Sequence, residues 1–432
     1  MHDFEVVVIL MAVAVALAIV AGWLRIPYPI LLVVGGLLLS LQTGAPRFSL
    51  PPDVVFLAFL PPLLYAAAFN THWQAFRKNI RSISLLAVGL VIFTTTCVAV
   101  VANQFLGMDW GPAFVLGAVV SPPDAVAAIA ITSRIRLPKI VSTLLEGESL
   151  VNDASALVAY RMAVAAVLYG VFSISEASVM FVASSVGGIL IGLAGAMLAV
   201  QLHRWLDHTK LADTKITIAI TLLTPYAVYL PAEHLHVSGV MAVVSAGLWV
   251  GSRCKRVFRH ELYIEARAVW EMMEFLLNGL IFILIGFQLP AILEGLDSKH
   301  SMIELGVQAL LISVVVIVTR ILWVFPGAYI PRWLDRLFTN CQDPYPPWQT
   351  VSVVAWTGMR GVVSLAAAMA IPATISNGDK FPDRELIQFL TFWVIFATLV
   401  GQGLTLPLVI RLLGINKHME NEADLHAEQS VC

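Results

Sequence analysis

The chain is divided into apolar segments of about 20 residues, separated by short loops that carry proline, glycine or charge. An apolar helix of about 20 residues spans the hydrocarbon core of a bilayer, which is about 30 Å thick. Of the 432 residues, 59% are hydrophobic and only 12% are charged. A soluble domain carries about 25% charged residues. The sequence therefore predicts an all-α polytopic membrane protein and excludes a soluble fold.

The apolar pattern predicts thirteen transmembrane helices. The expected spans are residues 4–24, 28–42, 53–69, 82–106, 111–132, 141–170, 178–202, 216–232, 237–252, 268–289, 303–325, 350–375 and 386–413. Nothing between them resembles a soluble domain, so residues 1–414 are expected to form one membrane domain. The acidic residues 415–432 are expected to form a short cytoplasmic tail.

Lys and Arg are distributed unequally between the two sides of this topology. With the N-terminus outside, the inner loops hold 19 of the 26 basic residues and the outer loops hold 4. Basic loops remain on the cytoplasmic side during membrane insertion. The pattern predicts an outer N-terminus, a cytoplasmic C-terminus and a location in the cell (inner) membrane.

An odd number of spans allows the two halves to be inverted repeats, about residues 4–170 and 216–413, joined by a linker helix at 178–202. Corresponding spans in the two halves are both interrupted, at 121–124 (SPPD) and at 356–361 (WTGMRG). Paired interruptions of this kind mark a binding site near the bilayer midplane. We therefore expect two broken helices that cross at the midplane.

Few charged side chains fall within the predicted spans. An Asp, Glu or Arg at the centre of a lipid-exposed helix costs about 2.5–3.5 kcal/mol on insertion scales, so such residues face the protein interior or a wet cavity. They are Asp124, Glu146, Glu148, Asp153, Arg161, Arg320 and Arg360. These residues are the candidates for function, with the exception of Arg161, which is assigned no role.

Helical spacing separates the polar residues of the sixth span into two stripes. Ser149 and Asp153 are four residues apart and share one face, whereas Glu148 and Asn152 form the neighbouring stripe. Asp153 and Ser149 therefore offer oxygens to one centre. Glu146 is nearer the inner membrane surface and is expected to be hydrated there.

The interruption in the fifth span offers further oxygens. Pro122 and Pro123 lack N–H donors, so carbonyls such as that of Pro123 are free to turn toward an ion. Asp124 is placed to cap the positive end of one half-helix, and Arg360 to compensate a negative end. A carboxylate, a hydroxyl and carbonyls together suit Na+ and H+.

Plainer structural roles stay open for several of these residues. Asp124 could act only as a helix cap, and Asp153 could act only as the partner of an arginine. For Glu148 the favoured interpretation is a buried ion pair that holds the fold together. Arg320 is its best candidate partner and Arg360 is the second.

Several short motifs follow one another in a recognisable order. They are DAV at 124–126, GESLVND at 147–153, NG at 278–279, GFQL at 286–289, TRIL at 319–322 and GMRG at 358–361. Together they resemble the sodium/hydrogen exchangers, the monovalent cation:proton antiporters, from about residue 60 to 370. The Asn-Asp pair and the short tail are similar to the electroneutral bacterial branch.

The resemblance implies roles for the site residues. It implies that Asp153 carries Na+ and H+ in turn, and that Asp124, Ser149 and the Pro123 carbonyl help to ligate Na+. It implies a homodimer in which a mobile core moves against a dimerisation scaffold.

The supporting residues have implied roles as well. The resemblance suggests that Asn152 supports the site and that Glu148 pairs with Arg320. Membrane lipid is expected around the protein, and neither nucleic acid nor a soluble protein is expected as a partner.

The chain departs from the family pattern at two places. Many relatives keep an acidic residue in the third helix, where this chain has Ala66. The proline that usually follows Asp124 is replaced by Ala125, and Pro123 precedes the aspartate instead. The first departure removes a carboxylate ligand, whereas the second only shifts the helix break.

The expected function is secondary active antiport of Na+, or another monovalent cation, for H+ at one buried aspartate by alternating access. Exchange is expected to be 1:1 because Asn152, and not a second aspartate, precedes Asp153. K+/H+ antiport stays open, as does ion-coupled symport of an organic anion, which Arg360 would favour. The chain is not expected to be an enzyme, and it needs no cofactor beyond the ions it carries.

Overall fold

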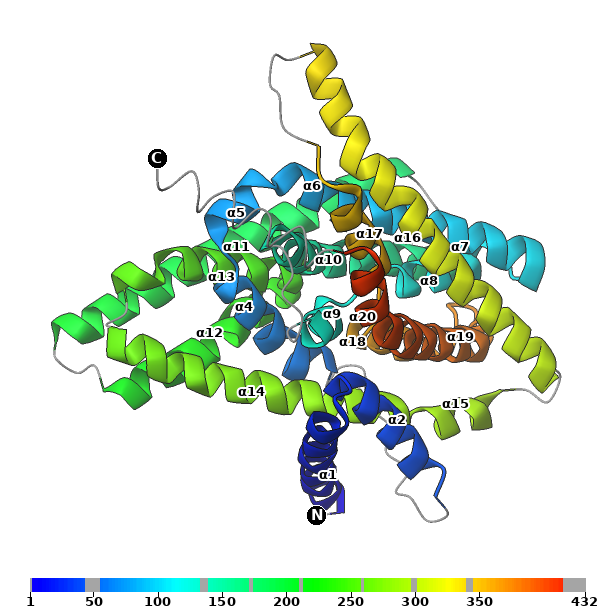
Figure 1. Ribbon diagram of the computed structural model, residues 1–432, viewed down its shortest axis with the longest axis horizontal. Helices are drawn as coiled ribbons and strands as arrows, with labels where there is room; N and C mark the ends of the chain where they lie inside the picture. The colour runs from blue at the N-terminus through cyan, green and yellow to red at the C-terminus, as the bar shows by residue number, and fades with distance from the viewer. Residues whose placement is uncertain are drawn as a thin grey trace.

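The computed structural model describes residues 2–42, 55–132, 139–170, 174–209, 213–257, 260–296, 301–338 and 345–414. Within these ranges the chain is almost entirely helical, and the β-bridge between Thr374 and Lys380 is isolated. Figure 1 shows long helices that cross one another around a centre made of shorter ones. The prediction of an all-α protein is confirmed.

The helices of the first half overlap the first seven predicted spans. They are α1 (His2–Leu24), α2 (Tyr28–Ser40), η1 (Val55–Phe59), α4 (Leu60–Asn70), α5 (Trp73–Lys78), α6 (Ile80–Ser84), η2 (Leu85–Gly89), α7 (Leu90–Leu106), α8 (Trp110–Val120), α9 (Ala125–Thr132), α10 (Lys139–Tyr169) and α11 (Ile174–His208). The segments η1 and η2 are π-helical turns that continue directly into α4 and α7.

The helices of the second half overlap the remaining six spans. They are α12 (Thr214–His234), α13 (Gly239–Val257), α14 (His260–Phe287), α15 (Leu289–Gly295), α16 (Met302–Phe338), α17 (Trp348–Trp356), α18 (Val362–Met369), α19 (Arg384–Phe396), η3 (Ala397–Gln402) and α20 (Gly403–Leu412). Several helices run past the predicted ends; α16, for example, continues through Pro326 and Pro331.

Eight helical segments of the described chain are long and apolar enough to cross a membrane. They are Val7–Leu24, Ile80–Leu106, Ile140–Tyr169, Ser178–His208, Thr214–His234, Leu262–Gly295, Met302–Trp333 and Arg384–Leu412. Three shorter apolar segments, Tyr28–Ser40, Val55–Asn70 and Trp110–Val120, lie among them. These lengths and compositions are those of a multi-pass membrane protein.

The buried side chains form two main clusters, and helix α10 contributes to both. The larger cluster is centred on α7, α8, α16, α19 and their neighbours, and the second is centred on α4, α11, α12 and α13. Helix α10 contributes Leu145 to the first cluster and Leu150 to the second. It therefore lies between two helical bundles, and its side chains contact both.

Glycines allow several of these helices to approach backbone to backbone. A methyl group added at Gly36 of α2 would meet the Ile283 carbonyl of α14, and one added at Gly286 of α14 would meet the Val33 carbonyl of α2. Lipid tails are as apolar as the side chains, so the hydrophobic effect does not bring helices together within a membrane. Membrane helices are instead held together by close van der Waals packing at small residues. The contact between α2 and α14 depends on both glycines.

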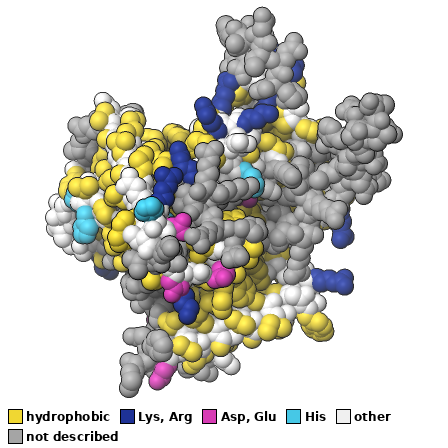
Figure 2. All heavy atoms as spheres, turned by 90° about the vertical axis from the view of Figure 1, so that its left-hand side faces the viewer, with side chains coloured by type: hydrophobic (Ala, Val, Ile, Leu, Met, Phe, Trp, Pro, Cys, Tyr) yellow, Lys and Arg dark blue, Asp and Glu magenta, His cyan; other side chains and the backbone are white. Residues whose placement is uncertain are grey.

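The outer surface of the second bundle is apolar. Figure 2 views the molecule from the left-hand side of Figure 1, and hydrophobic side chains cover much of that face. Large apolar residues are exposed along α11: Val179, Met180, Val182, Val186, Leu190, Met197, Leu198, Leu202 and Trp205. Such a surface suits contact with lipid tails.

Several sequence predictions fall outside the described residues. The acidic tail at 415–432 lies there, and so do the basic residues of the loop at 133–138. Arg47 and Lys299, two of the four basic residues that the predicted topology puts in outer loops, are also outside the described ranges. The predicted orientation of the chain therefore stays a prediction.

We expect Gly286→Ala to destabilise the protein by about 3 kcal/mol, because the added methyl group meets backbone atoms that cannot rotate away. The measurement is the midpoint of thermal aggregation in detergent. Gly306→Ala in α16 is the matched control, since nothing lies within 4 Å of a methyl group added there. Equal stability of the two variants would contradict the close contact between α2 and α14.

Candidate ion-binding site

The fifth predicted span is interrupted in its middle. Helix α8 ends at Val120 and α9 begins at Ala125, so residues 121–124 lie outside both helices. Two consecutive prolines account for the stop, because neither can donate the N–H bond that would continue the helix. The interruption leaves backbone groups of both half-helices without helical partners.

The twelfth predicted span is interrupted at the corresponding position. Helix α17 ends at Trp356 and α18 begins at Val362. Between them, Gly358 and Gly361 leave room for two charged neighbours: a methyl group at Gly358 would meet Arg320, and one at Gly361 would meet the Asp124 carboxylate. The glycines are therefore needed for close packing around the break.

The two interruptions contact each other directly. The backbone N–H of Asp124 donates to the Met359 carbonyl at 2.6 Å. The Asp124 carboxylate accepts the Val126 N–H at 2.8 Å and also lies against the N–H groups of Ala127 and Val362. One carboxylate thus faces the positive N-terminal ends of both α9 and α18.

Arg360 lies at the opposite, negative ends of the half-helices. Its Nε donates to the Val120 carbonyl, the last residue of α8, at 3.0 Å. Its Nη1 donates to the Gly358 carbonyl, just beyond the end of α17. The side chain is fully buried. The structure therefore places Asp124 and Arg360 at the helix ends that the sequence analysis assigned to them.

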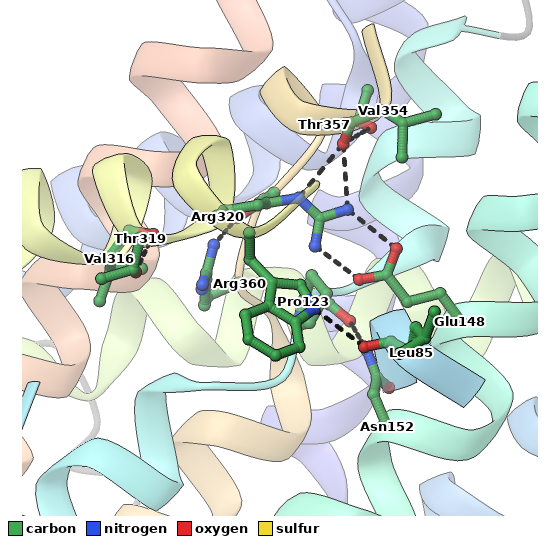
Figure 3. A network of polar contacts seen from close by, with 12 residues as sticks. Leu85, Pro123, Glu148, Asn152, Val316, Thr319, Arg320, Val354, Thr357 and Arg360 are labelled. Atoms are coloured by element: carbon green, nitrogen blue, oxygen red, sulfur yellow. Dashed lines mark hydrogen bonds and ion pairs between the residues drawn. The ribbon is translucent and has the colours of Figure 1, made fainter. Parts of the chain in front are cut away.

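Glu148 and Arg320 form a buried ion pair (Figure 3). Arg320 Nη1 donates to Glu148 Oε1 at 2.5 Å, and Nη2 donates to Oε2 at 2.9 Å. The arginine also donates to the Val354 carbonyl of α17 from Nε and Nη2, at 3.2 and 3.1 Å. The pair links α10, α16 and α17, and the pairing expected from the sequence is present.

Asn152 connects α10 to the first interruption. Its Nδ2 donates to the Pro123 carbonyl at 3.1 Å, as Figure 3 shows. Its Oδ1 is buried and has no hydrogen-bond partner among the described residues. The carbonyl predicted to face an ion is therefore oriented by a side chain on α10, and its second lone pair is still available.

Asp153 lies beside this arrangement and faces a cavity of about 90 Å³. The residue is only 7% exposed. Ser149, Pro123 and Asp124 line the same cavity, so all four predicted ion-binding residues are brought together. Among the described residues, no arginine or lysine forms an ion pair with Asp153. Asp153 therefore neither points into lipid nor is held by a guanidinium group of the described chain.

The cavity has further polar lining that the sequence analysis did not assign to the site. Glu146, Asn278 and Ser364 all line it. Glu146 is seven residues before Asp153 on one helix face, a spacing that could have revealed it. Ser364 lies on α18, in the second interrupted span. It reaches the cavity because α18 packs beside α10, and the sequence alone does not show that these distant helices are neighbours.

Two other residues of interest lie away from the cavity. Arg161, which had no predicted role, forms an ion pair with Glu233 of α12 at 3.0 Å. Ala66, where the family resemblance led us to expect an acid, lines a separate cavity of about 30 Å³ with Trp270 and Arg267. The main cavity therefore receives no carboxylate from α4.

Comparison with known proteins identifies the family. The model of the transmembrane domain of sodium/hydrogen exchangers matches residues 8–412. The chain belongs to the sodium/hydrogen exchanger family. It is therefore a cation/proton antiporter of the membrane, a transporter and not an enzyme, as the sequence predicted.

Individual exchangers agree with this assignment. The chain is 38% identical over 413 residues to an uncharacterised Na+/H+ exchanger of Mycobacterium tuberculosis, with 94% of this chain and 74% of that protein covered. It is 34% identical over 418 residues to the sodium, potassium, lithium and rubidium/H+ antiporter of Bacillus subtilis, with 95% and 62% covered. The exchanger fold is also shared with a solved sodium proton antiporter of Methanocaldococcus jannaschii. That match has a TM-score of 0.74 and 22% identity, and covers 96% of this chain and 99% of the other.

We expect Arg320→Met to lower the thermal stability of the exchanger in detergent, because Glu148 would then be a buried charge without a partner. Loss of one partner from a buried pair typically costs about 3–5 kcal/mol. The double variant Glu148→Met with Arg320→Met should recover much of this loss, since no unpaired charge remains. The measurement is the midpoint of thermal aggregation.

Arg204→Met is the control for loss of an exposed arginine from a helix, and it should leave the midpoint unchanged. A single Arg320→Met variant as stable as the wild type would show that the ion pair does not hold these helices together. A double variant no more stable than the single one would show that the loss of stability does not come from an unpaired charge on Glu148.

Proposed function

We propose that this exchanger binds a monovalent cation, with Na+ the foremost candidate, and H+ alternately at Asp153, and exchanges them 1:1 by alternating access. The observation that carries the proposal is the setting of Asp153. Its carboxylate is almost fully buried, faces a small cavity where two interrupted helices meet, and has no basic partner in the described chain. Such a group is stable in a membrane only with a proton or a cation.

The remaining residues of the site divide into ligands and supports. Asp153, Asp124, Ser149 and the Pro123 carbonyl are proposed to contact the ion, because all four line the cavity. Asp124 also faces the helix N-termini, so we propose that its carboxylate both caps these helix ends and contacts the ion.

The supporting residues keep the ligands in place without lining the cavity. Asn152 orients the Pro123 carbonyl, and Glu148 and Arg320 join α10 to α16 and α17. Arg360 neutralises the C-terminal ends of the half-helices. We propose no metal or cofactor other than the transported ions.

Competition for one carboxylate is sufficient to produce exchange. When Asp153 is protonated it offers no charge to a cation, and when a cation is bound the proton is displaced. Because Asn152 precedes Asp153, the helix supplies one titrating group at this position, which supports 1:1 stoichiometry. Each unit of pH gradient then drives about 1.4 kcal/mol of cation movement.

The choice of cation rests on the chemistry of the lining. The relative from Bacillus subtilis is named as an antiporter of sodium, potassium, lithium and rubidium, so exchange of K+ is retained as an alternative. In the part of the chain that is described, the cavity is lined by three carboxylates and no basic side chain. This lining favours cations and gives no support to symport of an organic anion.

The topology completes the proposal. We propose thirteen spans in a domain of residues 1–414, inverted repeats at about 4–170 and 216–413, and broken helices that cross at the membrane midplane. The N-terminus is placed outside the cell membrane and the tail at 415–432 in the cytoplasm. We further propose a homodimer within the lipid, with no nucleic acid or soluble partner, in which the bundle of α7, α8 and α16 moves against the bundle of α11 to α13.

Asp153→Asn should abolish the pH change that Na+, K+ or Li+ induces in everted membrane vesicles from cells without other cation/proton antiporters. The amide cannot release a proton or neutralise a cation. Asp379→Asn, which changes an exposed aspartate, is the matched control and should exchange normally. Both proteins must be present in the membrane and elute as single species in detergent. Normal exchange by Asp153→Asn would contradict the proposal.

A further inference from the structure

The cavity that holds Asp153 contains a third carboxylate, that of Glu146. Both residues lie on the continuous helix α10, seven positions apart. Seven residues are almost two full turns, so the two side chains share one face and lie about 10 Å apart along the helix axis. Both line the same cavity, together with Ser149 between them.

Glu146 lies nearer the beginning of α10 than Asp153 does. The helix begins at Lys139, and the loop before it carries the basic residues that predict the cytoplasmic side. An ion that enters the cavity from that side and moves along α10 therefore passes Glu146 before it reaches Asp153.

Glu146 has no polar partner among the described residues. Other glutamates at helix surfaces do have one: Glu233 pairs with Arg161, and Glu271 pairs with Arg267. Glu146 is partly buried, so its carboxylate has lost part of its contact with water, and no neighbour in the described chain neutralises it. The other charged groups that line the cavity, Asp124 and Asp153, are also acidic.

A second feature of the cavity is independent of these acids. Ser364 of α18 is 1% exposed and lines the cavity, yet its hydroxyl has no hydrogen-bond partner in the described chain. A buried hydroxyl without a partner is unfavourable, and native structures usually supply one from water or an ion. The cavity therefore presents unpaired negative charge on one helix and an unpaired neutral oxygen on another.

We propose that Glu146 is a second cation-binding carboxylate at the inner end of the cavity. It attracts the cation from the cytoplasmic side and passes it to Asp153, while the Ser364 hydroxyl adds a neutral oxygen to the path. Because the cation leaves Glu146 before exchange is completed, the residue sets the apparent affinity on the inner side and not the stoichiometry. This inference rests on the proposed function of Asp153.

The test compares Na+ dependence on the two sides of the membrane. In everted vesicles, Glu146→Gln should raise the KM for Na+ about 4- to 15-fold, the range expected for loss of one charge about 10 Å from the site in a medium of intermediate dielectric. The maximal rate should stay within about twofold of the wild type, because Asp153 is intact. In right-side-out vesicles the KM for Na+ should be unchanged.

Two further variants make the result specific. Glu146→Asp keeps the charge on a shorter side chain, so its KM should lie between those of the wild type and Glu146→Gln. Glu265→Gln removes an exposed carboxylate near the beginning of α14, which is also predicted to lie on the cytoplasmic side. This variant should leave the KM for Na+ unchanged. Should Glu146→Gln fail to accumulate in the membrane, Glu146→Asp gives the same comparison with a smaller shift.

Three outcomes would overturn the inference. An unchanged KM in Glu146→Gln would show a hydrated carboxylate without a role in binding. An equal rise in the KM of Glu265→Gln would show a general effect of surface charge. A loss of maximal rate in Glu146→Gln with an unchanged KM would show that Glu146 acts in a step after cation binding. Failure of this inference is distinct from failure of the proposed function, which is decided by activity in Asp153→Asn.

Discussion

Backbone groups that leave a helix within a membrane find no water there, and this constraint governs the centre of the molecule. Two spans stop and restart, and their four free ends meet. One carboxylate, Asp124, faces the N-terminal ends of α9 and α18, and one guanidinium, Arg360, faces carbonyls at the ends of α8 and α17. Each charge therefore lies where the backbone groups at the ends of the half-helices lack helical partners.

This arrangement explains why Asp153 stays available. The buried arginines already have partners: Arg320 is paired with Glu148, and Arg360 donates to backbone carbonyls. Asn152, one position away on α10, is engaged with the Pro123 carbonyl. Both guanidinium groups and the Asn152 amide therefore have contacts of their own, and Asp153 is left to face the cavity. A carboxylate in this position has to obtain its counter-charge from the solution, which is what a carrier of cations and protons requires.

Much of this could be predicted from the sequence because it depends on local patterns. Apolar length located the helices, and Pro122, Pro123 and Gly361 located the interruptions. The rarity of charge in apolar spans singled out Glu148 and Arg320 as partners.

What the sequence missed depends on which distant helices are neighbours. Ser364 lines the cavity only because α18 packs beside α10, and the Arg161–Glu233 pair requires α10 to meet α12. Glu146 was assigned to the membrane surface although its seven-residue spacing places it on the same face of α10 as Asp153; the extent of the cavity along that face depends on the helices packed around α10.

The central claim is that one buried carboxylate binds either a proton or a cation. The most direct measurement counts the protons released when Na+ is added to the purified protein in weakly buffered detergent, over a range of pH. The account predicts release of no more than one proton for each Na+ bound, with none released at high pH, where the carboxylate is already ionised. The apparent affinity for Na+ should fall about tenfold for each pH unit below the midpoint. Release of two protons for each Na+, or Na+ binding that never displaces a proton at any pH, would contradict it.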